Sequence, residues 1–114
     1  MQDKISITRH ETGDNLITID IKLNQDGGMT VLDWCCGSAA ETFCGHDDVE
    51  TYFSVGRDAA GELYQALTER AAKEPAQDLA VFLQSTKSGN TRVMSWLKGK
   101  CDQLGIEYKW HIWP

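Results

Sequence analysis

Four residues in one short stretch could bind a metal ion or act as nucleophiles: Cys35, Cys36, Cys44 and His46. A structural zinc site needs four such ligands, and its cysteines are usually separated by about two to four residues. Here seven residues separate Cys36 from Cys44, and a single residue separates Cys44 from His46. The spacing therefore predicts free thiols, with no metal site and no cofactor.

A Cys–His nucleophilic pair is the second chemistry to consider. Cys44 or Cys101 could attack, with His10, His46 or His111 as the base. No sequence pattern brings any such pair within hydrogen-bond reach. Cys101 lies on the expected buried face of a helix, where burial raises the thiol pKa and makes the sulfur inert. We therefore predict that the chain is not an enzyme and has no catalytic residues, with a small Cys/His metal protein as the remaining alternative.

The acidic residues are distributed unevenly along the chain. Residues 1–57 hold ten acids and four bases, whereas residues 58–114 hold seven of each, so the first half carries the whole net charge of −6. A one-sided negative field repels nucleic acids and attracts cationic partners. Asp47, Asp48 and Glu50 form the densest cluster; it fits a solvated loop and strand edge, a protein-binding face or, less simply, a cation site. The charge predicts a basic protein partner and no nucleic acid.

The first half of the chain has the two-residue period of strands. Apolar and polar residues alternate over Ile5–Thr8 and Ile17–Leu23, and strand character returns over Met29–Cys36 and Val49–Val55. Gly-containing turns separate the first three of these segments. They predict an antiparallel meander, followed by an irregular connection over residues 37–48 and a fourth strand.

The second half changes to the period of helices. Asp58 is the expected N-cap of a first helix, which Pro75 should terminate, and Gly105 should end a third helix after a shorter second one. Residues 106–112 then alternate as a closing strand. The apolar stripes expected to face the core are Ala60, Leu63, Tyr64, Leu67 and Ala71; Leu79, Phe82 and Leu83; Val93, Leu97, Cys101 and Leu104; and Ile106, Tyr108, Trp110 and Ile112.

Strands followed by helices and one closing strand predict a single α+β domain over residues 1–114. We expect a mostly antiparallel sheet with an N-terminal meander, helices packed on one face, and a C-terminal strand. No apolar run approaches the roughly 20 residues of a membrane helix, and the N-terminus lacks the apolar stretch of a signal peptide. We therefore expect a cytoplasmic protein without a membrane partner. Trp113 should lie on the sheet face opposite the core, either covering that face or remaining exposed.

Two stretches carry a resemblance to a known class of proteins. Residues 47–67 combine an aromatic strand, a polar cap and a helix with paired leucines, and residues 93–114 combine a helix ending in a Cys-containing turn with a Gly-Ile-x-Tyr strand and a terminal aromatic. Together they resemble bacterial toxin-immunity proteins of the contact-dependent growth inhibition and polymorphic toxin systems.

The resemblance implies an antitoxin-like protein that neutralises a cognate toxin by stoichiometric binding to its C-terminal effector domain. Nucleases are the expected effectors, because their basic clefts receive phosphates. Another kind of protein inhibitor or adaptor, such as a phage-encoded nuclease blocker, is the alternative. Recognition residues tend to lie on loops and strand ends. The predicted partner contacts are Asp33, Trp34, Glu41, Asp47, Asp48 and Glu50.

Overall fold

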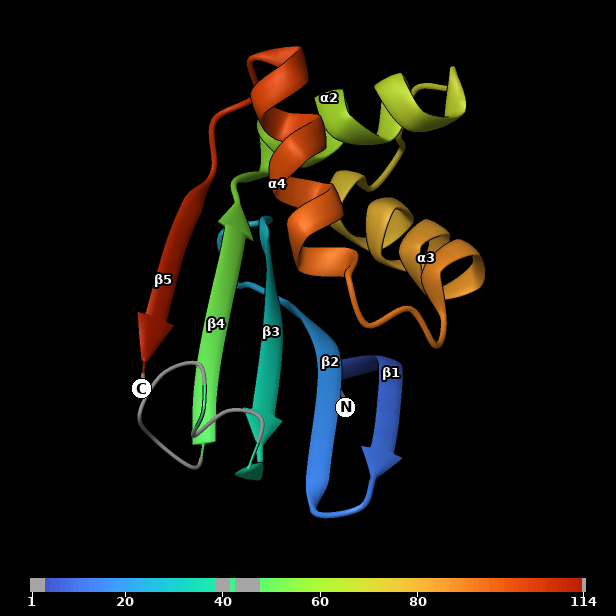
Figure 1. The fold of residues 1–114 in the computed structure, drawn as a ribbon. Coiled ribbons are helices and arrows are strands. Elements are labelled where there is room, and N and C mark those ends of the chain that lie inside the picture. Colours follow the sequence, from blue (N-terminus) through green and yellow to red (C-terminus); the bar gives the residue numbers. More distant parts are fainter. Residues whose placement is uncertain (1–3, 39–41, 43–47, 114) are drawn as a thin grey trace.

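A computed structural model of the chain describes residues 4–38, 42 and 48–113. The described elements follow the predicted order of four strands, three helices and a closing strand (Figure 1). The elements are β1 (Lys4–Thr12), β2 (Asn15–Leu23), β3 (Met29–Cys36), β4 (Asp48–Val55), α2 (Arg57–Thr68), α3 (Pro75–Lys87), α4 (Val93–Leu104) and β5 (Lys109–Trp113).

The sheet is a five-stranded antiparallel meander in the order β1-β2-β3-β4-β5, so every strand pairs with its neighbour in sequence. The predicted α+β class, the N-terminal meander and the C-terminal strand are confirmed. The helices α2, α3 and α4 lie over one face of the sheet, near the end where β4 leads into α2 (Figure 1). At the other end of the sheet, the strands extend beyond all three helices.

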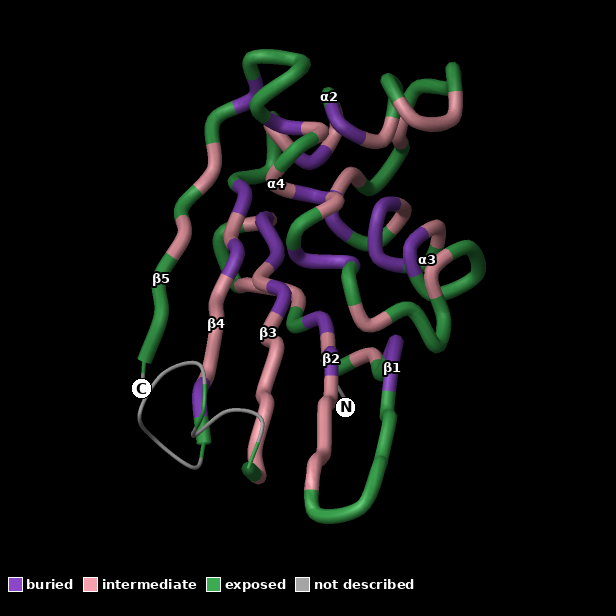
Figure 2. The backbone as a smooth tube through the Cα atoms, viewed as in Figure 1, coloured by how far each residue is buried: buried purple, intermediate pink, exposed green. Residues whose placement is uncertain are grey.

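The core lies between the helices and the half of the sheet that they cover. Side chains from one face of β2, β3 and β4 enter it, and Figure 2 shows buried residues concentrated there. Val31 and Phe53, which are cross-strand partners at its centre, are fully buried. The strand residues of the core are Ile7, Ile19, Ile21, Met29, Val31, Phe53 and Val55; among its helical residues are Ala60, Leu63, Leu79, Leu83, Val93, Leu97 and Cys101.

The helix ends differ from the sequence prediction in two places. The N-cap of α2 is Gly56 rather than Asp58, because β4 runs into the helix and the N–H of Ala60 already donates to the Gly56 carbonyl. α2 ends at Thr68, where Glu69 takes a left-handed conformation, and Pro75 begins α3 instead of ending α2. Proline suits that first helical position, because its missing N–H would have no intrahelical partner there. Gly105 does cap α4 in the left-handed conformation, as predicted.

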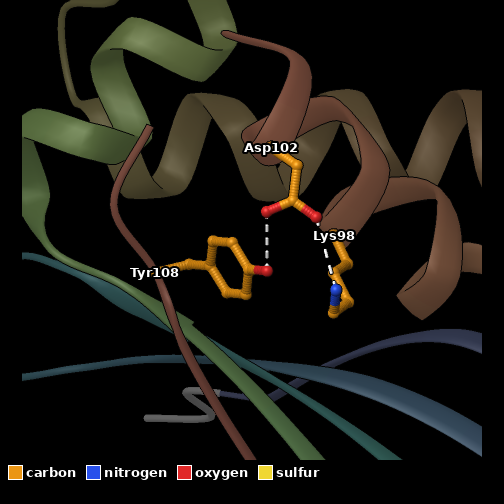
Figure 3. A network of polar contacts seen from close by, with 3 residues as sticks. All are labelled: Lys98, Asp102 and Tyr108. Atoms are coloured by element: carbon orange, nitrogen blue, oxygen red, sulfur yellow. Dashed lines mark hydrogen bonds and ion pairs between the residues drawn. The ribbon is translucent and has the colours of Figure 1, made fainter. Parts of the chain in front are cut away.

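A polar network fixes the path from α4 into β5 (Figure 3). The Tyr108 hydroxyl donates to Asp102 Oδ1 at 2.8 Å, and Lys98 Nζ approaches Asp102 Oδ2 at 3.3 Å. These contacts, the Tyr108 hydrogen bond foremost, lower the pKa of Asp102. The Tyr108 ring stacks on Phe53 with 5.5 Å between ring centroids. The contacts therefore anchor the start of β5 against the core.

The turn between β2 and β3 leaves no room for a side chain at Gly28. A Cβ atom there would lie 2.4 Å from the Val55 carbonyl oxygen.

We expect Gly28→Ala to lower the free energy of unfolding by about 1–3 kcal/mol, as other overpacking substitutions do. The control is Gly99→Ala in α4, where the added Cβ meets nothing within 4 Å. Alanine is the better helix former, so that variant should gain about 0.5–1 kcal/mol. Urea denaturation measures both, and equal shifts would contradict the packing argument.

Candidate functional site

The sheet face opposite the helices carries a mixture of aromatic rings and carboxylates. Strand pairing places Trp34 beside Glu50, and Glu50 beside Trp113, in one row across β3, β4 and β5. The next row holds Leu32, Tyr52 and His111. Core residues come from the other face, so no described helix packs on these side chains. We call this surface, defined by Leu32, Trp34, Asp48, Glu50, Tyr52, His111 and Trp113, the open face.

A hollow of about 320 Å³ lies on the open face and is lined by Asp48, Glu50, Tyr52 and Trp113. The Tyr52 hydroxyl donates to Glu50 Oε2 at 2.5 Å, which fixes the carboxylate beside the ring. The same contact raises the pKa of Tyr52. The Trp113 side chain is 57% exposed, and its ring meets the edge of His111 with 4.7 Å between centroids. A bound group would therefore touch aromatic surface and carboxylate oxygens together.

The carboxylates of the hollow, Asp48 and Glu50, lack the ion pairs that several other acidic residues of the described chain form. Lys4 pairs with Asp20, Arg9 with Glu11, and Lys98 with Asp102. Within the described residues, no lysine or arginine forms an ion pair with Asp48 or Glu50. The β1–β2 side of the sheet is thus locally compensated, whereas the β4–β5 side presents uncompensated negative charge.

The six predicted contact residues do not all lie on this surface. The structure places Trp34, Asp48 and Glu50 on the open face. Asp33 lies on the opposite face, because neighbours along a strand alternate and its cross-strand partner is the buried Ile19. Glu41 and Asp47 lie outside the described residues.

Sequence reasoning missed Tyr52 and His111 as members of the site, and left the role of Trp113 open. The alternation in β4 already placed Tyr52 opposite Phe53. What the sequence could not supply was the pairing of Glu50 with Trp113, which brings together residues separated by three helices. The expectation that Ile112 belongs to the core was wrong, since its side chain is 51% exposed. It faces the helix side, but at the end of β5 beyond the helices.

Comparisons of the chain with models of protein families, with curated proteins and with solved structures found no match. The geometry of this chain therefore carries the functional argument. No helix in the described part of the chain is long and apolar enough to cross a membrane.

The candidate chemistry of the cysteines can be placed only in part. Cys44 and His46 are outside the described residues, and across residues 4–38, 42 and 48–113 no group of three or more potential ligands surrounds a metal position. Cys35 and Cys36 are strand neighbours on opposite faces of the sheet, so they do not point into one site. Cys101 is fully buried, and burial raises the pKa of its thiol to about 11, as predicted for a core cysteine.

Asp33 has a different environment from the acids of the open face. It is half-buried beside Ile19, and no hydrogen bond or ion pair joins its carboxylate to another described residue. Burial raises its pKa from 3.8 to about 6. At a pH between these two values, Asp33 is therefore protonated in the folded state and ionised in the unfolded state. Folding stability from this group falls as pH rises from about 4 to 6, and the cost is fully present at pH 7.

Replacing Asp33 by asparagine should therefore stabilise the protein at pH 7. We expect a gain of about 1–2 kcal/mol, less than the full pKa shift implies because water still screens the carboxylate. The gain should shrink to a small fraction near pH 4, where Asp33 is protonated in the folded state and about half protonated in the unfolded state. Denaturant titrations at the two pH values measure this, with the exposed Glu62→Gln in α2 as a control. A gain that persists unchanged at pH 4 would contradict the titration argument.

Proposed function

We propose that the chain is an immunity-type inhibitor that binds a basic toxin effector domain and neutralises it by stoichiometric occlusion. The observation that carries the proposal is the open face, where two carboxylates without a cationic partner in the described chain lie among the exposed Trp113 ring and the half-buried Trp34 and Tyr52 rings. Such a surface combines the two components of a strong protein interface, a flat aromatic contact and a charge that selects the partner.

Aromatic exposure favours a macromolecular partner. Trp113 and Trp34 lie on either side of Glu50 in the sheet; the Trp113 ring is exposed and the Trp34 ring is half-buried. Tryptophan and tyrosine are enriched at the residues that dominate binding energy in protein interfaces, because they contribute much contact area and lose little side-chain entropy. A rigid sheet also needs little ordering on binding, so more of the contact energy appears as affinity.

The charge of the open face favours a basic partner. Uncompensated carboxylates at the β4–β5 side would attract a cationic surface and accelerate encounter through electrostatic steering. The resemblance of residues 47–67 and 93–114 to immunity proteins adds the class of partner, a toxin effector domain. A nuclease fits that class best, since its basic cleft is built for phosphates, and an acidic inhibitor would occupy it in place of nucleic acid.

The test uses the product of the gene directly upstream of this chain, which the proposal expects to be a toxin effector domain. Co-expression with the chain should restore growth, and the purified pair should form a one-to-one complex. The association rate should fall steeply as salt is raised from about 0.05 to 0.5 M, because the Debye length shrinks to a few ångströms. Absence of any complex, measured by calorimetry, would refute the proposal.

Charge reversal separates the open face from other acidic surfaces. Glu50→Lys should slow association by about ten-fold or more, because it replaces an attraction by a repulsion at the contact. Glu62→Lys, which makes the same change of charge on α2 away from the open face, should have a much smaller effect. Asp33→Asn changes the opposite face of the sheet and should leave the association rate unaltered. Equal effects of the Glu50 and Glu62 reversals in stopped-flow measurements would show that only net charge matters.

A further inference from the structure

The hollow at Asp48, Glu50, Tyr52 and Trp113 is too small and open for a folded element, but it matches one side chain in size and chemistry. Its volume of about 320 Å³ lies at the lower end of the range for ligand pockets. Two carboxylates line it on one strand, and the Trp113 ring comes from the adjacent strand. The occupant must therefore be cationic and have an apolar or planar surface.

Another tryptophan of this chain, Trp96, is already covered by cationic side chains of the chain itself. Lys87 Nζ lies 4.0 Å from the centroid of the Trp96 ring, and Lys100 Nζ lies at 6.0 Å. No such cation covers Trp113 within the residues that the structure describes. Trp113 is therefore an exposed aromatic ring next to carboxylates. The ring face and the carboxylate oxygens are the two components that bind an organic cation.

Arginine fits this arrangement better than lysine. A guanidinium group is planar, so it can stack on an indole ring while its edge donates two parallel hydrogen bonds to a carboxylate. It is also more weakly hydrated than an ammonium group, and so less is lost when it leaves water. The Tyr52 hydroxyl already holds Glu50 Oε2, which pre-orients the carboxylate for such a contact.

We propose that this hollow is the receptor for an arginine side chain of the protein partner, with the guanidinium stacked on Trp113 and paired with Glu50. Asp48 adds a second negative charge at the rim. The identity of the partner as a toxin domain rests on the proposed function, but the arginine-binding property belongs to the hollow itself. It makes one arginine of the partner the anchor of the interface.

The test needs no partner, because N-acetyl-arginine amide can serve as the probe. The protein is labelled with ¹⁵N, and the four tryptophan indole signals are followed as the probe is added, with the Trp113 signal assigned by Trp113→Phe. We expect saturable shifts at Trp113 with a dissociation constant on the order of 10 mM, as a stacked and ion-paired single side chain allows. The Trp96 signal should stay fixed, since Lys87 already covers that ring.

The matched neutral probe is N-acetyl-citrulline amide, which keeps the planar shape and removes the charge. It should produce no saturable shift, and N-acetyl-lysine amide should bind several-fold more weakly than the arginine probe. Glu50→Gln should weaken arginine binding by about three- to ten-fold, whereas Glu62→Gln should not change it. The dispersed amide spectrum of each variant checks that it is folded.

Three outcomes would overturn the inference: no saturation at Trp113, equal shifts with citrulline, or undiminished binding by folded Glu50→Gln. A protein that protects cells from an effector yet gives one of these results would retain the proposed function and lose the arginine receptor. A protein that binds arginine as expected but neither binds nor neutralises the upstream effector would retain the receptor and lose the proposed function.

Discussion

The contact on which the structure depends is the packing of three helices against one face of the sheet, centred on Val31 and Phe53. In a strand, successive side chains point to opposite faces, so burying one set of residues fixes the direction of the other. A shift of the β3–β4 register by one residue would bury Glu50 or Trp34 and expose Phe53. Hydrophobic burial therefore determines which residues are available for recognition, although none of those residues takes part in the core.

Much of the fold follows from sequence periodicity, and the reason is local. Alternation over Ile17–Leu23 and Met29–Cys36 indicates strands with one apolar face, and short glycine turns join them, so neighbours in sequence become neighbours in the sheet. The helix termini were harder to predict, since Gly56 replaces Asp58 as the cap of α2 and Glu69 ends that helix early. Those differences arise from the direct β4–α2 connection and from a left-handed residue that no side-chain preference favours.

The candidate site was less accessible to prediction for a physical reason. Trp34 and Glu50 could be proposed because they lie near strand ends, but the hollow also needs Trp113, which long-range pairing delivers. That pairing depends on where α4 ends and on the path of the chain from there into β5. Gly105 ends the helix, and the path is then held by the stacking of Tyr108 on Phe53 and by its hydrogen bond to Asp102. Sequence spacing gives no measure of this placement. Asp33, by contrast, was proposed as a contact from its position along the chain, yet its neighbour in the sheet is the buried Ile19.

Asp33 and Glu50 are both acidic, but they lie on opposite faces of the sheet and affect the protein differently. Glu50 lies on the open face, where its carboxylate accepts the Tyr52 hydrogen bond and forms no ion pair with any residue that the structure describes. Asp33 lies toward the helix side, where burial opposes its ionisation and the fold becomes less stable near neutral pH. The net charge of −6 is therefore not a uniform field. Ion pairs cancel part of it on β1 and β2, and Asp33 directs part of it toward the helix side of the sheet. The charge beside Trp113 remains available for recognition, and a cationic partner would gain most from meeting it there.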